Sequence, residues 1–309
     1  MQKKIFELKP SGYHWVDLSQ PTEDDVENLA EHYGLHPTSV EDCLEPKHLP
    51  KFEHVSGLNF LILRAYDERC SSDADTVQEL TRKMAVFAGK NFVLTVHRSD
   101  QPFIADLRQK WGQLLSTSEP KPTQLLAEIL ESAVMTYEAP LETTLIALED
   151  LESRIFRGDD SRQIIQDGFY FKRRLSIFRR ILRLTLDVVR KLHSESETQS
   201  PLLQDVREHA ERLLFSAEEL HDNVQSLLRL HLSLESQRTN EASLQTNSVV
   251  RLLTVVSVFF MPISFITSLY GMNFDLSEFH WKHGYAFVWG AMGLSTVGTY
   301  IWMKKRGWL

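Results

Sequence analysis

The sequence predicts an α+β membrane protein with an N-terminal cytoplasmic α/β domain, a long helical stalk and two C-terminal transmembrane helices. Three observations predict it. Short β-rich segments alternate with helical ones over residues 1–120, residues 121–251 are almost all helix formers, and two uncharged apolar runs follow. The predicted divisions are 1–120, 121–251, 252–270, 271–284, 285–303 and 304–309.

The first 120 residues have the pattern of an α/β domain. A helix is predicted over Thr22–Tyr33, because Pro21 and Thr22 followed by two acidic residues make a favourable helix start. The stretch Ser118–Pro122, with two prolines, predicts a domain boundary. Four segments have the residue types of strands: Tyr13–Leu18, Leu58–Tyr66, Arg82–Ala88 and Asn91–His97.

Residues 123–251 predict three long helices, with breaks near 158–161 and 194–201. The first, Glu128–Glu152, contains seven carboxylates and no lysine or arginine. The second, Lys172–Lys191, contains eight basic residues and one acid, Asp187. Such opposite charges either neutralise each other on solvated faces or concentrate cations at a cytoplasmic mouth, and the sequence leaves both readings open.

The third helix is predicted to be continuous over Leu202–Tyr270, because this stretch has no glycine and Pro262 as its single proline. At 1.5 Å per residue it would extend roughly 100 Å, from the cytoplasm through the membrane. A proline within a membrane helix is tolerated where a neighbouring helix, hydroxyl or water satisfies the freed carbonyl.

Two charge-free runs, Leu252–Leu269 and Tyr285–Met303, are each long enough to span roughly 30 Å of hydrocarbon. Basic residues flank them at Arg251 and at Lys304–Arg306, which predicts cytoplasmic termini and an external loop. The alternative is a buried hairpin in a soluble core. No signal peptide is expected, because the first ten residues lack a long apolar stretch.

Composition excludes several classes of function. A net charge of −8 argues against a nucleic-acid partner. The two cysteines, Cys43 and Cys70, would lie in the reducing cytoplasm, so neither a disulfide nor a thiol metal site is expected. No phosphate-binding glycine loop, metalloprotease motif or nucleophile and base pair stands out, so neither an enzyme nor a resident cofactor is predicted.

Polar and small residues form one stripe on the first membrane run. Ser257, Met261, Ser264 and Ser268 are spaced four, three and four residues apart, and Val250 and Thr254 extend the stripe toward the cytoplasm. Such a stripe either packs against another helix or lines a water-filled lumen. Because one helix cannot enclose a pore, the second reading requires an oligomer.

Several motifs spread along the chain resemble one family. They are W-V-D-L at Trp15–Leu18, G-L-H-P-x-x-x-E-D at Gly34–Asp42, P-K-x-E at Pro50–Glu53, K-N-x-x-x-T-V-H at Lys90–His97, F-M-P at Phe260–Pro262, G-M-N at Gly271–Asn273 and the basic tail Lys304–Leu309. With them, the chain resembles the CorA family of divalent-cation channels and transporters.

The resemblance implies a funnel-shaped homopentamer in the cell's inner membrane, with one stalk helix per subunit lining a pore. It implies that Gly271, Met272 and Asn273 form the selectivity filter, in which Asn273 contacts Mg²⁺ through its hydration shell. Neutral amide oxygens suit this ion, which gives up its water reluctantly. The implied pore-lining residues are Val250, Leu253, Ser257, Met261, Ser264 and Ser268, of which the apolar ones can gate by dewetting.

The external loop qualifies the expected ion. Asp275 and Glu278 are expected to attract cations, although Leu276-Ser277-Glu278-Phe279 stands where the family commonly has Met-Pro-Glu-Leu. His280 and His283 would suit Zn²⁺, Ni²⁺ or Co²⁺ better than Mg²⁺, which leaves a transition-metal transporter of the same fold as an alternative. A membrane-anchored sensor or scaffold that transports nothing is the alternative from another class.

Regulation by intracellular Mg²⁺ is also implied by the resemblance. Asp205 is the candidate sensor residue, and the alternative is an ordinary solvated aspartate. Its partner across a subunit boundary is expected among four carboxylates: Asp67, Glu68, Asp73 and Asp75. Mg²⁺ would then be both the transported and the regulatory ion, with Co²⁺, Ni²⁺ or Zn²⁺ as other cargo.

Overall fold

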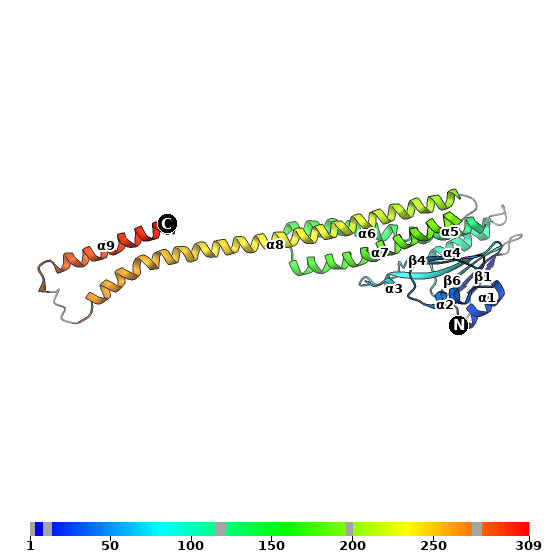
Figure 1. Cartoon of the computed structure of the whole chain (residues 1–309), viewed down its shortest axis with the longest axis horizontal. Coiled ribbons are helices and arrows are strands. Elements are labelled where there is room, and N and C mark those ends of the chain that lie inside the picture. Colours follow the sequence, from blue (N-terminus) through cyan, green and yellow to red (C-terminus); the bar gives the residue numbers. More distant parts are fainter. Residues whose placement is uncertain (1–3, 9–13, 115–121, 196–199, 274–279, 309) are drawn as a thin grey trace. The chain divides into compact units, whose positions relative to one another are not determined.

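The computed structural model describes residues 4–8, 14–114, 122–195, 200–273 and 280–308. The chain divides into two compact units, residues 1–230 and residues 231–309. Figure 1 shows the helices and strands of each unit.

The first unit contains a six-stranded sheet with the order β1-β2-β6-β5-β4-β3 in the described part of the chain. The strands β2 and β6 pair in parallel, and the other neighbours are antiparallel. The sequence predicted the four inner strands, whereas the two edge strands, β1 and β3, were not predicted. Their bounds are β1 Lys4–Leu8, β2 His14–Ser19, β3 Lys51–Val55, β4 Leu58–Tyr66, β5 Thr81–Ala88 and β6 Phe92–His97.

Helices cover both faces of this sheet, so the unit has three layers (Figure 1). Side chains alternate along each strand: Leu61 and Leu63 belong to one core, and Phe60 and Ile62 belong to the other. The helices α1 (Glu23–Tyr33) and α2 (Pro37–Leu44) cover one face. The opposite core contains residues of α4 (Pro102–Leu114), α5 (Pro122–Met135), α7 (Ser161–Glu195) and α8 (Pro201–Tyr270). A one-turn helix, α3 (Val77–Leu80), precedes β5.

The predicted start of α1 is confirmed in detail. Thr22 is the N-cap, its hydroxyl accepts a hydrogen bond from the Asp25 N–H, and the Asp25 carboxylate accepts one from the Thr22 N–H. This reciprocal capping satisfies two N–H groups that the first helical turn leaves without partners. Gly34 ends the helix at φ 65°, a left-handed conformation that favours glycine.

The predicted helix Glu128–Glu152 is wrong as a single element, because the chain breaks between α5 and α6 (Glu138–Arg157). Pro140 explains the break: it has no N–H, and its ring would collide with the carbonyl of residue 136 in a continuous helix. The chain restarts so that Pro140 falls in the first turn of α6, where that N–H is not needed. The predicted break near 158–161 is confirmed, since Gly158 caps α6 at φ 77°.

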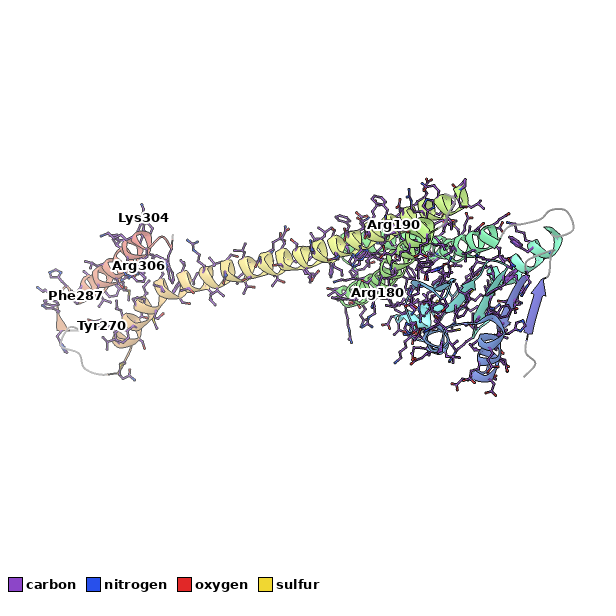
Figure 2. The ribbon with its side chains drawn as sticks, turned by 45° about the vertical axis from the view of Figure 1, so that its right-hand side comes forward. Arg180, Arg190, Tyr270, Phe287, Lys304 and Arg306 are labelled. Carbon is purple, nitrogen blue, oxygen red and sulfur yellow. The ribbon has the colours of Figure 1, made fainter. Side chains whose placement is uncertain are left out.

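One interpretation of the sequence was that the acidic segment Glu128–Glu152 and the basic segment Lys172–Lys191 neutralise each other. The structure contradicts it. Arginines of α7 pair instead with carboxylates of α8: Arg190 with Glu211 at 2.9 Å, and Arg183 with Glu218. Figure 2 shows Arg180 and Arg190 on α7. The ion pair that joins α6 to α7 among the described residues has reversed charges, Arg154 with Asp167 at 2.7 Å. Three exposed α6 carboxylates have no ion pair in the described part: Glu142, Glu149 and Glu152.

Helix α8 is 70 residues long and contains Pro262, as predicted. Among the described helices it is the one both long and apolar enough to cross a membrane, and its apolar stretch is not buried. The second predicted span coincides with α9 (Gly284–Lys305), whose 22 residues include four glycines and are less apolar. Every residue from 236 to 250 of α8 is exposed.

Candidate functional site

One face of the apolar part of α8 is exposed along its length. It contains the six residues that the resemblance assigns to a pore: Val250, Leu253, Ser257, Met261, Ser264 and Ser268. Leu253 is 66% exposed and Met261 is 76% exposed. The half-buried residues are Thr254, Val255, Val258, Phe259, Pro262, Ile263, Ile266 and Tyr270. At 100° per residue the two sets are centred about 160° apart around the helix, so they face nearly opposite directions.

The half-buried face of α8 is the side on which α9 lies. Ile263 and Tyr270 line a groove of about 930 Å³ together with Val288 and Met292 of α9. Thr254 lines a smaller one with Trp308, and Val250 lies at the edge of that groove, at the border of the exposed face. In Figure 2, Tyr270 marks the end of α8, Phe287 the start of α9, and Lys304 the end of α9. Since α9 lies on this side, the face that contains Ser257 and Met261 has no partner in the described part of a single chain.

The hydroxyl groups of Ser257 and Thr254 on α8 are bonded within the helix. Ser257 donates to the Leu253 carbonyl at 2.8 Å, and Thr254 donates to the Val250 carbonyl at 2.7 Å. Because each of these hydroxyl groups donates its hydrogen to a backbone carbonyl, the lone pairs of its oxygen remain available to accept hydrogen bonds. Outward-facing acceptor oxygens suit the water shell of a cation. Thr254 itself is half-buried, at the border of the exposed face.

The G-M-N segment follows the last residue of α8 directly. The Gly271 N–H donates to the Thr267 carbonyl at 2.9 Å, and a Cβ at Gly271 would lie 3.0 Å from that same oxygen. Gly271 is not in the left-handed region, so the turn does not require glycine through its φ angle. Met272 is 48% exposed and Asn273 is exposed. These two side chains are therefore free to contact other copies or solvent.

The acidic residues expected to attract cations, Asp275 and Glu278, lie outside the described residues. His280 and His283 are both exposed, and His283 is the N-cap of α9 without a side-chain capping bond. In the described ranges, no three side chains of histidine, cysteine, aspartate or glutamate are grouped to hold a metal ion. The two histidines therefore do not form a complete metal site with other described residues.

Arg251 has a role that the sequence did not predict. Its Nη2 donates to the carbonyls of Trp308 at 2.8 Å and Gly307 at 3.2 Å, which ties the start of the apolar stretch to the C-terminal tail. The Arg306 guanidinium stacks over the Trp302 ring at 5.8 Å, and Trp302 contacts Trp308. The sequence indicated Arg251 only as a topology signal, because carbonyl acceptors have no sequence signature.

Asp205, the candidate sensor, is exposed on α8 in the first unit and makes no hydrogen bond or ion pair with other described residues. Of the four carboxylates expected to oppose Asp205, two already form ion pairs within the chain. Asp67 pairs with Arg82 at 2.6 Å, and Asp75 pairs with Arg173. The remaining two candidates, Glu68 and Asp73, are exposed and form no salt bridge in the described part.

Two motifs of the first unit meet in a buried polar network. Asp17 is fully buried on β2, and its carboxylate accepts a hydrogen bond from Thr95 of β6, pairs with Arg108 of α4, and lies 3.1 Å from His97 Nε2. The Trp15 Nε1–H donates to Thr95 Oγ1 at 3.1 Å. The W-V-D-L and T-V-H motifs thus stabilise the contact between the two parallel strands. The sequence marked them only as family features, because their contact depends on the strand register.

Comparisons with known proteins identify the family of the chain. The sequence model of the family described as CorA-like Mg²⁺ transporter protein matches residues 10–305. The cobalt/magnesium transport protein CorA of Thermotoga maritima is 27% identical over 304 residues, which cover 96% of this chain and 83% of that protein.

Two solved structures share the fold. The complete CorA magnesium transporter from Methanocaldococcus jannaschii has a TM-score of 0.60 at 20% identity, covering 98% of this chain and 94% of that one. The ZntB cytoplasmic domain from Vibrio parahaemolyticus has a TM-score of 0.52 at 16% identity, covering 76% and 89%. The resemblance seen in the motifs is confirmed by the family match over nearly the whole chain: the protein belongs to the family of CorA-like Mg²⁺ transporters.

Proposed function

We propose that this protein transports divalent cations, with Mg²⁺ as the principal ion, through a pore that α8 helices from several copies surround. The observation that most directly supports this proposal is the exposed face of α8, which lies opposite α9 and ends at Gly271. One chain cannot enclose a lumen, so the proposal requires an oligomer. The family resemblance supports five copies in the inner membrane, with both termini in the cytoplasm and α9 as the second span.

Ion selection is proposed to occur at a ring of Asn273 side chains, with Gly271 and Met272 shaping the turn that holds them. An amide oxygen accepts hydrogen bonds from the water shell of Mg²⁺ without replacing that water. Val250, Leu253 and Met261 would then form apolar constrictions below the ring, which close the pore when they exclude water. Asp275 and Glu278 would raise the local concentration of cations at the entrance.

Intracellular Mg²⁺ is proposed to hold the pore closed by bridging Asp205 to a carboxylate of a neighbouring copy. Glu68 and Asp73 are the candidates that no arginine already neutralises. An Asp205→Ala variant should therefore keep transporting at internal Mg²⁺ concentrations that stop the unchanged protein. Unchanged inhibition in this variant would return Asp205 to the role of a solvated surface residue.

Transport is tested with the purified protein in lipid vesicles that contain a fluorescent Mg²⁺ indicator. We expect Mg²⁺ entry that Asn273→Ala abolishes or makes unselective, while the variant elutes at the same oligomeric size. A parallel series with Co²⁺, Ni²⁺ and Zn²⁺, with and without a pH gradient, tests the cargo. Entry of Zn²⁺ or Ni²⁺ without Mg²⁺ would support the transition-metal alternative at His280 and His283. If none of the four ions enters, the protein is a sensor or scaffold, and the transport proposal is wrong.

The pore-lining face is tested with cysteine pairs at equal membrane depth. Ser257→Cys lies on the exposed face, and Val255→Cys lies on the half-buried face toward α9. In a background with Cys70→Ser, a small water-soluble thiol reagent should block Mg²⁺ entry through the first variant and not through the second. Equal block, or block of the second alone, would mean that this face does not line the pore.

A further inference from the structure

Three cations form a row across the first unit's sheet, on the face that α1 and α2 cover. Arg64 of β4 lies directly opposite Lys83 of β5 in the strand register. The register of β5 with β6 pairs Met84 with His97, so the next position along brings Arg98 beside Lys83. Like charges directly opposite each other destabilise a sheet. Something must therefore offset the repulsion within this row.

Backbone carbonyls offset part of it. Lys83 Nζ donates to the carbonyls of Asp42 at 2.8 Å, Cys43 at 2.7 Å and Glu45 at 2.5 Å, which uses all three of its hydrogens. Arg64 donates from Nε to the His48 carbonyl and from Nη2 to the Pro46 carbonyl. Arg98 donates one N–H to the Leu44 carbonyl. These bonds fix the cations and cap α2, but carbonyls are dipoles and leave the net charge in place.

Most carboxylates near the row pair with other side chains, but the charge of Glu45 raises the pKa of Lys83 and so offsets part of the row's charge. Asp42 directs its side chain to His48 at 2.6 Å and to Lys51. Asp67 neutralises Arg82, a cation of the cavity wall, and Asp17 pairs with Arg108 on the other face of the sheet. Glu45 accepts a hydrogen bond from the Lys47 N–H. Burial raises the pKa of the Cys43 thiol to about 11, so this side chain contributes no negative charge at neutral pH.

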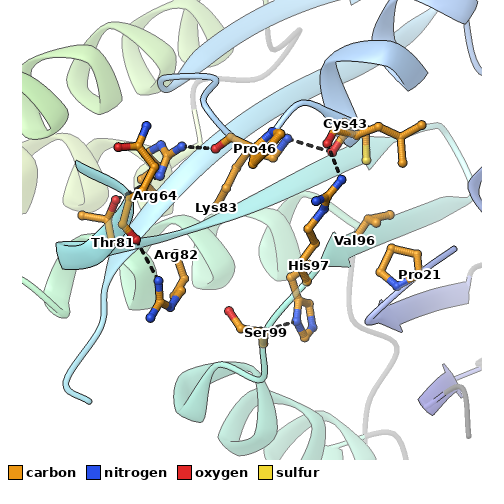
Figure 3. Close-up of a pocket in the computed structure, with 13 residues that line it drawn as sticks. Pro21, Cys43, Pro46, Arg64, Thr81, Arg82, Lys83, Val96, His97 and Ser99 are labelled. Carbon is orange, nitrogen blue, oxygen red and sulfur yellow. Dashed lines mark hydrogen bonds between the residues drawn. The ribbon is translucent and has the colours of Figure 1, made fainter. Parts of the chain in front are cut away.

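A cavity of about 350 Å³ lies against these cations (Figure 3). Figure 3 shows Arg64 and Lys83 with their hydrogen bonds to the carbonyls of Pro46 and Cys43. Among its lining residues no side chain is a carboxylate, and apolar groups of Pro21, Leu44 and Val96 complete the wall. Arg98 is exposed and has four N–H groups beyond the one bonded to Leu44, so it can bind a ligand directly.

We infer that this cavity binds a phosphate-bearing anion of the nucleoside phosphate class, whose phosphates contact Arg98 while its base packs on the apolar wall. Guanidinium groups bind phosphate oxygens in a bidentate manner. Lys83 and Arg64, on the strands beneath the cavity, add positive charge that attracts the anion. The cavity exceeds the size of a single phosphate group, so the apolar wall has room for the rest of such a molecule. This site is independent of the proposed ion pathway.

Lys83 provides a signature of binding. Burial, together with the neighbouring charges of Arg64 and Arg98 and against the opposing charge of Glu45, lowers the pKa of Lys83 to about 8. At pH 8 about half of the molecules therefore have a neutral Lys83. An anion in the cavity favours the charged form. Binding at pH 8 should therefore take up a fraction of a proton, whereas binding at pH 6.5, where Lys83 is already charged, should take up much less.

The test is calorimetric titration of the full-length protein in detergent, without divalent ions, with inorganic phosphate, pyrophosphate or ADP. We expect ADP to bind, with proton uptake at pH 8 revealed by repeating the titration in buffers of different ionisation enthalpy. Tighter binding of ADP than of pyrophosphate supports a nucleotide, and equal binding of all three supports a site for free phosphate.

The matched variants are Arg98→Gln and Arg69→Gln, which remove one exposed arginine each. Arg69 lies outside the cavity, and its side chain has no hydrogen bond or ion pair with the described residues. Arg98→Gln should weaken binding roughly tenfold or more, as expected for a charged hydrogen bond to phosphate. Arg69→Gln should leave it unchanged. Failure of all three anions to bind, or equal affinity in the two variants, would mean that the cations only cap α2.

Discussion

Replacing Asp17 with asparagine tests the buried network that joins β2 to β6. Asp17 is fully buried, and its partner Arg108 has a side chain only 20% exposed. Asparagine keeps the shape but removes the charge, so the largely buried Arg108 guanidinium loses its ion pair with Asp17. Breaking a buried pair in this way costs about 3–5 kcal/mol, and the exposed fifth of Arg108 places the expected loss near the lower limit, about 3 kcal/mol. Burial already lowers the pKa of Arg108, which shows that its charge is poorly solvated.

The assay is thermal unfolding of the full-length protein, followed by tryptophan fluorescence, because Trp15 and Trp111 are both fully buried in the first unit. For a unit of this size, 3 kcal/mol corresponds to a fall in Tm of roughly 6–12 °C. Glu142→Gln, which removes an exposed and unpaired carboxylate of α6, is the control and should stay within about 0.5 kcal/mol. Adding Arg108→Met to Asp17→Asn should restore part of the loss, because no buried charge then remains. If Asp17→Asn melts with the control, the network does not stabilise the fold.

Two further predictions concern cysteine reactivity and glycine conformation. Burial raises the pKa of the Cys43 thiol to about 11, so at pH 8 it is thiolate in about one molecule in a thousand. N-ethylmaleimide should therefore label Cys70 first, as followed by mass spectrometry. Equal labelling rates would contradict the burial of Cys43. Gly158→Ala should lower the free energy of unfolding by about 1 kcal/mol, because φ 77° at this position is a left-handed conformation that disfavours alanine. Gly112→Ala in α4, where a Cβ has open space, should be neutral or stabilising. The same sign for both glycine variants in denaturant melts would refute this reading.

The sequence predicted the inner strands well, because their apolar residues are shared between two cores. It missed β1 and β3, which are short edge strands with charged residues, and edge strands lack the pattern of burial on both faces. It also predicted one helix where Pro140 forces two. Local signals such as the Thr22 cap and Gly158 were readable, since the chemistry of each lies within four residues.

Contacts that depend on strand register could not be predicted from the sequence in the same way. Asp17 and Thr95 pair because β2 and β6 are adjacent and parallel, and Arg64 meets Lys83 because of one antiparallel register. The same limit explains the charges on α6 and α7: their composition was correctly read, but the counter-ions come from α8. The exposed face of α8 is the opposite case. Its residues are spaced along a single helix, so periodicity alone was enough to group them.

The exposed stretch at 236–250 of α8 has a consequence for the life of the protein in the cell. It is rich in serine, threonine and asparagine, which favour helix less than alanine does by about 0.5 kcal/mol each, and nothing in the described part of a single chain covers it. A helix of this length and composition is marginal in water without tertiary support. If copies assemble around α8 as proposed above, a newly made copy without partners would display an easily opened segment that proteases can cut. The amount of intact chain would then follow the extent of assembly, and orphan subunits would be removed before they reach their working form.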